Sequence, residues 1–115
     1  MPVPRVIKFY KHYFLEFYTA QVSEVRRKIN QVLKLVETQE HIPAKFFRSI
    51  ETVDGLYEIR IEMMGNIYRI FCCFDKGNLV MLFQGFQKKS QKTPADQIAR
   101  AARLMQEYFN EKEAQ

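Results

Sequence analysis

The hydrophobic positions of the first third of the chain predict a short strand and then a helical region. Residues 5–10, Arg-Val-Ile-Lys-Phe-Tyr, are β-branched and aromatic, which favours a strand. From about Tyr13 the spacing becomes helical, with an apolar face made of Val22, Val25, Ile29, Val32, Leu33 and Val36. Arg27, Gln31 and Lys34 project from the opposite, solvated face. The pattern allows either two helices separated near residues 19–23 or one long bent helix.

The middle of the chain predicts a three-stranded antiparallel meander. Pro43 ends the helical region near residues 40–45, and a loop or irregular strand follows as far as residue 55. Three strand-like runs then occupy residues 56–62, 66–74 and 79–87. Gly65 and Gly77 lie between these runs, where tight hairpins require a positive φ.

Alternation along these strands separates an apolar face from a face that carries two arginines. Side chains two residues apart share a face of a strand. The apolar face contains Tyr57, Ile59, Ile61, Tyr68, Ile70 and Cys72. The other face contains Glu58, Arg60, Glu62 and Arg69, together with Phe71 and Cys73. The arginines of two neighbouring strands are therefore expected on the same side of the sheet.

A C-terminal helix is predicted to begin near Pro94. Thr93 is the expected N-cap, with Pro94 in the first turn and Asp96 three residues after the cap. The core-facing positions are Ile98, Ala101, Ala102, Met105, Tyr108 and Phe109. Residues from Glu111 onward are expected to fray.

Length and composition favour a single globular domain, residues 1–115. Hydrophobic residues make up 47% of the 115 positions, and no apolar run approaches the roughly 20 residues of a membrane helix. The start of the chain has no secretory signal pattern, so we expect a cytoplasmic protein. The formal charge of +5 favours a polyanionic partner.

The cysteines and histidines give no indication of a metal or another cofactor. Cys72 and Cys73 are adjacent, so in a strand they point to opposite faces and are expected to be reduced core residues. His12 and His41 are distant from the cysteines and from each other, without ligand spacing. We therefore predict that the protein uses no cofactor.

The most distinctive polar segment runs from Gln84 to Pro94 and contains Lys88, Lys89 and Lys92 without any acidic residue. These lysines follow the third strand and are expected to meet Arg60 and Arg69. Arginine binds phosphate bidentately and lysine acts as a mobile charge, so the set suits an RNA backbone. Phe86 is a candidate for stacking on a base, as is Tyr68, while Gln91 and Lys92 are candidates for binding the RNA chain.

Structural alternatives exist for each of these residues. Arg60 lies between Glu58 and Glu62 and could pair with an acidic residue across the strands, whereas Arg69 has no acidic neighbour in its own strand. The three lysines could form a solvated turn. Phe86 could belong to the core, and Tyr68 even more readily because it lies on the apolar face.

RNA cleavage would have to proceed here without the usual histidine pair. The 2′-hydroxyl must lose a proton, the leaving oxygen must gain one, and negative charge on the phosphate must be stabilised. A lysine can transfer protons if its pKa is lowered, which a neighbouring cation, such as Lys89 beside Lys88, would favour. A site of this kind depends on a substrate that is already well positioned, as on a larger scaffold.

Three segments in order resemble the phage-derived HigB-like branch of the RelE/ParE toxin superfamily. They are Leu-Tyr-Glu-Ile-Arg at residues 56–60, Tyr-Arg-Ile-Phe at residues 68–71, and residues 82–94, which contain Gly-Phe-Gln-Lys-Lys-Ser-Gln-Lys-Thr-Pro. The resemblance covers nearly the whole chain. It implies an α+β fold in which N-terminal helices pack on a twisted, mainly antiparallel sheet, with a C-terminal helix.

The same resemblance implies the toxin of a type II toxin-antitoxin pair. Such a toxin cleaves mRNA in the ribosome without a metal and is inhibited by an antitoxin, often one with a helix-turn-helix domain. Arg60, Arg69, Lys88 and Lys89 then correspond to the catalytic cleft, with Phe86 and Lys92 at its margin. Several RelE-type toxins have a tyrosine or histidine near the end of the last strand, where this chain has Phe86 and Gln87. The proton-transfer residue is therefore unassigned.

Two other functions fit the sequence. A ParE-like inhibitor of DNA gyrase would need no RNA-cleaving site. A non-catalytic module would use the same basic residues to bind RNA or a protein.

Overall fold

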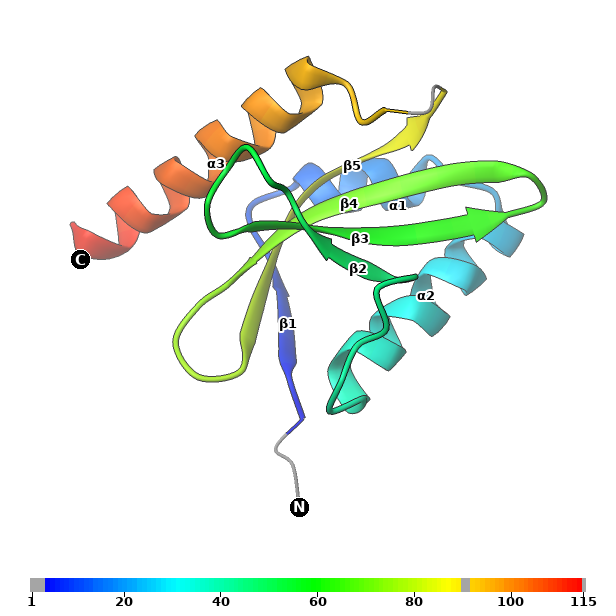
Figure 1. Ribbon diagram of the computed structural model, residues 1–115, viewed down its shortest axis with the longest axis horizontal. Helices are drawn as coiled ribbons and strands as arrows, with labels where there is room; N and C mark the ends of the chain where they lie inside the picture. The colour runs from blue at the N-terminus through cyan, green and yellow to red at the C-terminus, as the bar shows by residue number, and fades with distance from the viewer. Residues whose placement is uncertain (1–3, 90–91, 115) are drawn as a thin grey trace.

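The computed structural model describes residues 4–89 and 92–114 and contains eight helices and strands in that part of the chain. Figure 1 shows their arrangement. In chain order they are β1 (Val6–Phe9), α1 (Tyr13–Thr19), α2 (Ser23–Thr38), β2 (Phe47–Ser49), β3 (Leu56–Met63), β4 (Asn66–Phe74), β5 (Leu79–Lys88) and α3 (Ala95–Glu113). The predicted first strand, the three later strands and the C-terminal helix are all present.

The strands form one five-stranded sheet in the order β1-β5-β4-β3-β2. β2 pairs antiparallel with β3, β3 with β4 and β4 with β5, which confirms the predicted meander. β1 instead pairs parallel with β5, with Val6 opposite Leu79. The α+β fold, with helices at both ends of the chain and a mainly antiparallel sheet, is as expected.

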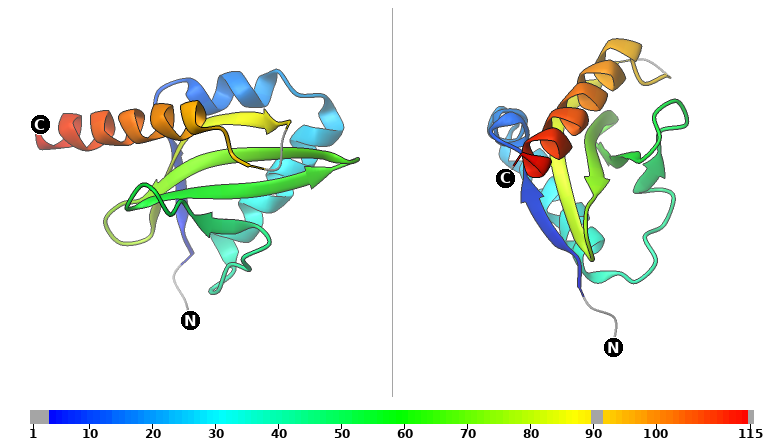
Figure 2. Two further views of the ribbon diagram at one scale, coloured as in Figure 1. Left: turned by 45° about the horizontal axis from the view of Figure 1, so that its top comes forward. Right: turned by 90° about the vertical axis from the view of Figure 1, so that its left-hand side faces the viewer.

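Helices cover both faces of the sheet (Figure 2). On one face α1 and α2 pack on the apolar side chains of the strands, including Ile59, Ile70 and Leu82. On the other face α3 packs on a second core, which the alternation pattern did not predict. This second core contains Leu56, Phe71, Cys73, Met81 and Phe83 from the strands and Ala101, Leu104 and Tyr108 from α3. The second face is therefore polar only where α3 does not cover it.

An irregularity in β5 determines which of its side chains face α3. Ile70 lies opposite Gly85 and Cys72 lies opposite Leu82, so two residues of β5, Phe83 and Gln84, lie opposite one residue of β4. A β-bulge of this kind allows consecutive side chains to serve the same face. Phe83 packs in the second core, and Gln84 Nε2 donates a hydrogen bond to the carbonyl oxygen of Gln97 in α3 at 3.0 Å.

The N-terminal helical region forms two helices, which settles the alternative that the sequence left open. α1 ends at Thr19 and α2 begins at Ser23. Val22 was expected in the core, but it is the N-cap of α2 and is 61% exposed. Its position just before the helix places its side chain outside the face that packs on the sheet.

The start and the end of α3 both differ from the prediction. Pro94 is the N-cap, and no side chain caps the helix, so Thr93 does not have the predicted role. Its hydroxyl instead donates a hydrogen bond to Glu58. The helix continues to Glu113 rather than fraying from Glu111, and Leu104, which the sequence analysis omitted, is buried in the second core.

The two cysteines confirm the alternation of β4. Both are buried and free, with Cys72 in the core beneath α1 and α2 and Cys73 in the core beneath α3. Burial raises the pKa of both thiols.

As for membrane insertion, none of the helices in residues 4–89 and 92–114 has the length and apolar composition that crossing a bilayer requires.

Candidate anion-binding site

The polar part of the second face lies where β3 turns into β4 and where β5 ends. Arg60 pairs in register with Arg69, and Arg69 pairs with Phe86 on β5. In the next row Ile67 lies between Glu62 and Lys88. Because paired residues project to the same side of a sheet, the two arginines and Lys88 occupy one surface.

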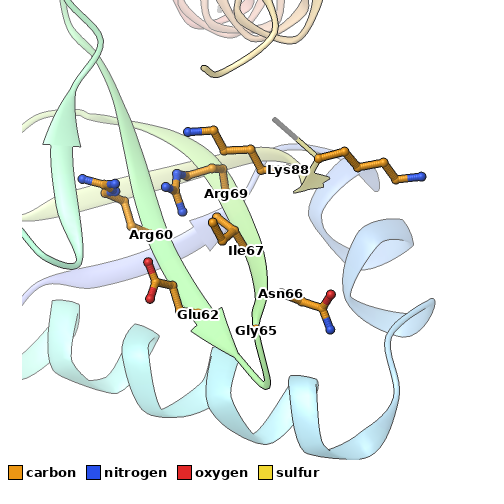
Figure 3. Close-up of a pocket in the computed structure, with 8 residues that line it drawn as sticks. Arg60, Glu62, Gly65, Asn66, Ile67, Arg69 and Lys88 are labelled. Atoms are coloured by element: carbon orange, nitrogen blue, oxygen red, sulfur yellow. The ribbon is translucent and has the colours of Figure 1, made fainter. Parts of the chain in front are cut away.

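These side chains border a pocket of about 580 Å³, which we call the basic pocket. It is lined by Arg60, Glu62, Gly65, Asn66, Ile67, Arg69, Lys88 and Lys89. Figure 3 shows the charged ends of Arg60, Arg69 and Lys88 gathered over the sheet, with Glu62 to one side. The structure thus brings together all four residues predicted to be catalytic.

Arg69 is the most deeply buried of these cations, with 1% of its surface exposed. Its Nε lies 3.6 Å from Glu58 Oε2, and its Nη1 donates a hydrogen bond to the carbonyl oxygen of Tyr68 at 3.0 Å. Within the described part of the chain, Nε has no hydrogen-bond acceptor, and the same holds for the buried Nε of Arg60. Buried donors of this kind are costly unless a ligand supplies acceptor oxygens.

The ion pair in this region involves Arg69 rather than Arg60, for which the sequence suggested an ion pair as a structural alternative. Arg60 was the suggested partner of an acidic residue, but among the described residues it forms no ion pair within 4.0 Å, whereas Arg69 pairs with Glu58. The register of the strands explains why Glu58 pairs with Arg69. Glu58 lies opposite Phe71 and therefore diagonally across from Arg69, a distance that long side chains span.

Burial and neighbouring charges change the proton affinity of the pocket's cations. Burial lowers the pKa of the Arg69 guanidinium, and Arg60 lowers it further. Burial likewise lowers the pKa of the Lys88 ammonium, with additional contributions from Arg69 and Arg60. A lowered lysine pKa was anticipated, but its sources are burial and the arginines rather than Lys89, which is exposed.

The aromatic candidates lie partly or wholly in the core. Phe86 is half-buried and stacks on Phe71 with ring centroids 5.7 Å apart. Tyr68 is buried on the opposite face, against Phe17 and facing α1, so it cannot stack on an RNA base bound at the basic pocket. Of the remaining candidates, Lys92 is exposed, and Gln91 lies outside the described residues.

Sequence reasoning missed several polar residues of this region. Glu62 and Asn66 line the basic pocket, and Glu58 accepts a hydrogen bond from Thr93 Oγ1 at 3.3 Å while it pairs with Arg69. Strand alternation had already placed Glu58 and Glu62 on the face of the arginines. What it could not supply was the register between strands, which decides their partners.

The fold and the pocket define an α+β protein with clustered cations at one end of its sheet. The model of the family described as "Phage derived protein Gp49-like (DUF891)" matches residues 16–106, and the chain belongs to this family. The family is toxin-like and of the RelE/ParE type of toxin-antitoxin proteins. The matched residues include the whole of β3, β4 and β5, and therefore the basic pocket. Comparison with curated proteins gives no match.

Proposed function

We propose that this protein is the toxin of a type II toxin-antitoxin pair, of the HigB-like branch, and that it cleaves mRNA on the ribosome. The observation that carries the proposal is the basic pocket, where Arg60, Arg69 and Lys88 converge and where two buried guanidinium N–H groups have no acceptor in the described part of the chain. A phosphodiester provides acceptor oxygens for the guanidinium groups and a negative charge that complements the cations. Family membership supports the same conclusion.

In the proposed reaction the ribose 2′-oxygen attacks the adjacent phosphorus and the bond to the 5′-oxygen breaks. Arg60 and Arg69 donate hydrogen bonds to the non-bridging oxygens, where negative charge increases in the transition state. Lys88 is the candidate general acid that gives a proton to the departing 5′-oxygen, because a lowered pKa brings an ammonium closer to the range useful for acid-base catalysis, while the proton of the 2′-hydroxyl passes to water. Arginine and lysine provide the positive charge, so the proposed mechanism requires no metal.

The ribosome and an antitoxin complete the proposed function. The basic pocket contains few groups that could act as a general acid or base, so the ribosome must hold the mRNA in a reactive geometry. Such positioning can lower the activation barrier by several kcal/mol. We propose that a cognate antitoxin of the helix-turn-helix type inhibits the toxin. Both mRNA and ribosome place the action of the toxin in the cytoplasm.

Expression of the chain without antitoxin, followed by mapping of mRNA ends, tests the proposal. The intact protein should arrest growth and cut translated mRNA, and Arg60→Gln should reduce cleavage by about a hundredfold or more, as expected when one donor to a transition-state oxygen is lost. Lys34→Gln removes the same charge from the exposed side of α2 and is the matched control. Its cleavage should equal that of the unmodified protein.

Two outcomes would contradict the proposal. Arrested cells with intact mRNA and induced DNA damage would instead indicate a gyrase inhibitor. RNA binding without cleavage or arrest would indicate a non-catalytic binding module. Thermal unfolding of each variant establishes that any lost activity is not lost folding.

A further inference from the structure

Three separate parts of the chain meet at one carboxylate oxygen beside the basic pocket. Glu58 Oε2, on β3, lies 3.6 Å from Arg69 Nε on β4 and accepts a hydrogen bond from Thr93 Oγ1 at 3.3 Å. Thr93 belongs to the connection between β5 and α3, which also contains Lys92 and begins just beyond Lys88. The carboxylate therefore connects the buried Arg69 with Thr93, which lies just before α3.

Neither Thr93 nor Glu58 makes the interactions that are usual for its residue type at such a position. A threonine before a helix usually caps it, yet α3 has no side-chain cap and Thr93 contacts Glu58 instead. Glu58 itself is only 8% exposed, an unusual place for a carboxylate. A contact that departs from local preferences in this way is characteristic of functional regions.

We propose that Glu58 is the positioning residue of the basic pocket and acts with Thr93 to hold the Arg69 guanidinium in the geometry that binds RNA phosphate. This inference rests on the proposed function. Glu58 does not contact the substrate phosphate in this role, because its charge would repel it. Its carboxylate instead lies 3.6 Å from Arg69 Nε and holds the guanidinium at the wall of the basic pocket.

Glu58 also changes the proton affinity of the cations in the basic pocket. Glu58 raises the pKa of both Arg69 and Lys88, which opposes the lowering caused by burial and by the neighbouring arginines. Glu58 thus keeps Lys88 protonated to a higher pH. The other charged groups around Lys88 are Arg60, Glu62 and Lys89, which line the same pocket.

Two acidic residues of this region provide a matched pair for the test. Glu62 lines the basic pocket and is exposed, and among the described residues it forms no hydrogen bond or ion pair with Arg69. Glu58→Gln and Glu62→Gln remove the same charge near the same ligand. If each carboxylate only repels the RNA phosphates, both variants should bind RNA more tightly. If Glu58 positions Arg69, the two variants should change affinity in opposite directions.

The measurement is the affinity of the full chain for a short 2′-O-methylated single-stranded RNA, which binds but cannot be cleaved. We expect Glu58→Gln to weaken binding by about tenfold, because Arg69 loses the ion pair that holds it in place, and Glu62→Gln to strengthen it. Thr93→Val changes no charge and keeps the shape of the side chain, and it should weaken binding by roughly threefold.

A pH titration separates positioning from general stability. RNA affinity should decline on the alkaline side as Lys88 loses its proton, and this decline should move to lower pH in Glu58→Gln but not in Thr93→Val. A defect of folding alone would not shift the midpoint. If Glu58→Gln does not fold, Thr93→Val and Glu62→Gln still carry the comparison.

Tighter binding by Glu58→Gln, or unchanged binding by Thr93→Val, would overturn the inference and leave the proposed function intact. An unmodified protein that does not bind the RNA would also overturn the inference, whereas only translated mRNA that stays intact during expression would overturn the proposed function. Weaker binding by Glu58→Gln and Thr93→Val, together with tighter binding by Glu62→Gln, would establish Glu58 as a positioning residue.

Discussion

Gly85 marks a place where a single side-chain atom would disturb the packing of α1. A Cβ at this position would lie 2.5 Å from Phe17 Cδ2 and 2.7 Å from Phe17 Cγ, far closer than carbon atoms approach. The backbone of Gly85 needs no positive φ, so the requirement for glycine is one of space alone. The glycine that opens the Gly-Phe-Gln-Lys-Lys segment is therefore a packing residue beneath the basic pocket.

Gly85→Ala should reduce the free energy of unfolding by about 1–3 kcal/mol, the usual cost of overpacking a core. Urea denaturation measures the change. Phe17→Leu supplies the missing room, so the double variant should recover part of the loss relative to Gly85→Ala. A fully additive effect of the two substitutions would show that the contact with Phe17 is not the cause.

Lys88 should give RNA binding a distinct alkaline limit. Its lowered pKa means that it loses its charge at a pH below the ordinary lysine value of 10.5, and affinity falls as that charge disappears. Lys88→Arg keeps the charge throughout this range and should remove the decline. Affinity for 2′-O-methylated RNA, measured at constant salt, checks this, with Lys34→Arg as the control. An unchanged decline in Lys88→Arg would assign it to another group.

At the scale of single residues, sequence reasoning found cations more readily than their partners. Arg69 and Lys88 followed from alternation and from a lysine-rich segment without acids. The pairing of Arg69 with Glu58 depends on strand register, and the half-buried place of Phe86 depends on Phe71 beneath it. Neither is a property of local sequence.

At the scale of elements, two polar clusters fasten α3 to the sheet. In one, Tyr10 Oη donates a hydrogen bond to Glu107 at 2.9 Å, and Lys11 pairs with the same carboxylate at 2.8 Å. In the other, Asp75, in the turn after β4, accepts hydrogen bonds from Tyr108 and from Lys112. Asp75 is the more buried anchor, with 4% of its side chain exposed.

The Asp75 cluster predicts how acid should loosen α3. Burial raises the pKa of Asp75, but hydrogen bonds from Lys112, Tyr108 and the Lys76 amide outweigh this and lower it to about 2, below the ordinary value of 3.8. A carboxyl with a lowered folded-state pKa contributes stability that is complete above its unfolded pKa and is lost as the pH falls through the folded one. Stability from this cluster should therefore disappear between about pH 4 and pH 2.

Asp75→Asn tests this anchor directly. It should lower the free energy of unfolding by about 2 kcal/mol at neutral pH, because it weakens hydrogen bonds to a charged group. The difference between the variant and the unmodified protein should shrink as the pH approaches 2, where Asp75 is protonated. Chemical denaturation at several pH values measures both. A constant difference across this range would contradict the assignment.

The sequence predicted the elements better than their contacts. The meander was evident from period-two alternation and from Gly65 and Gly77 in its turns, both of which adopt positive φ. The second core was not predicted, because Phe71 and Cys73 share their face of the sheet with Arg69 and the alternation therefore indicates a polar surface. The bulge at Phe83 and Gln84 was not predicted either, because an extra residue in a strand produces no recognisable pattern in the local sequence.

At the scale of the whole molecule, the net charge of +5 should make RNA binding depend on salt. The logarithm of the affinity should fall by about 0.7 per phosphate neutralised for each unit in the logarithm of salt concentration. Arg60→Gln should reduce this slope by about 0.7, and Lys34→Gln should leave it unchanged. Salt titrations of both variants measure this. Equal slopes in all three proteins would place the RNA outside the basic pocket.

The parallel pairing of β1 with β5 has a consequence for biosynthesis. Val6 cannot find its partner Leu79 until most of the chain has been made, and the same late strand brings Lys88 to the arginines of β3 and β4. Contacts between such distant residues form late, whereas the helices of the first half can form early. A nascent chain therefore passes most of its translation without the basic pocket, which is complete only when synthesis is almost finished.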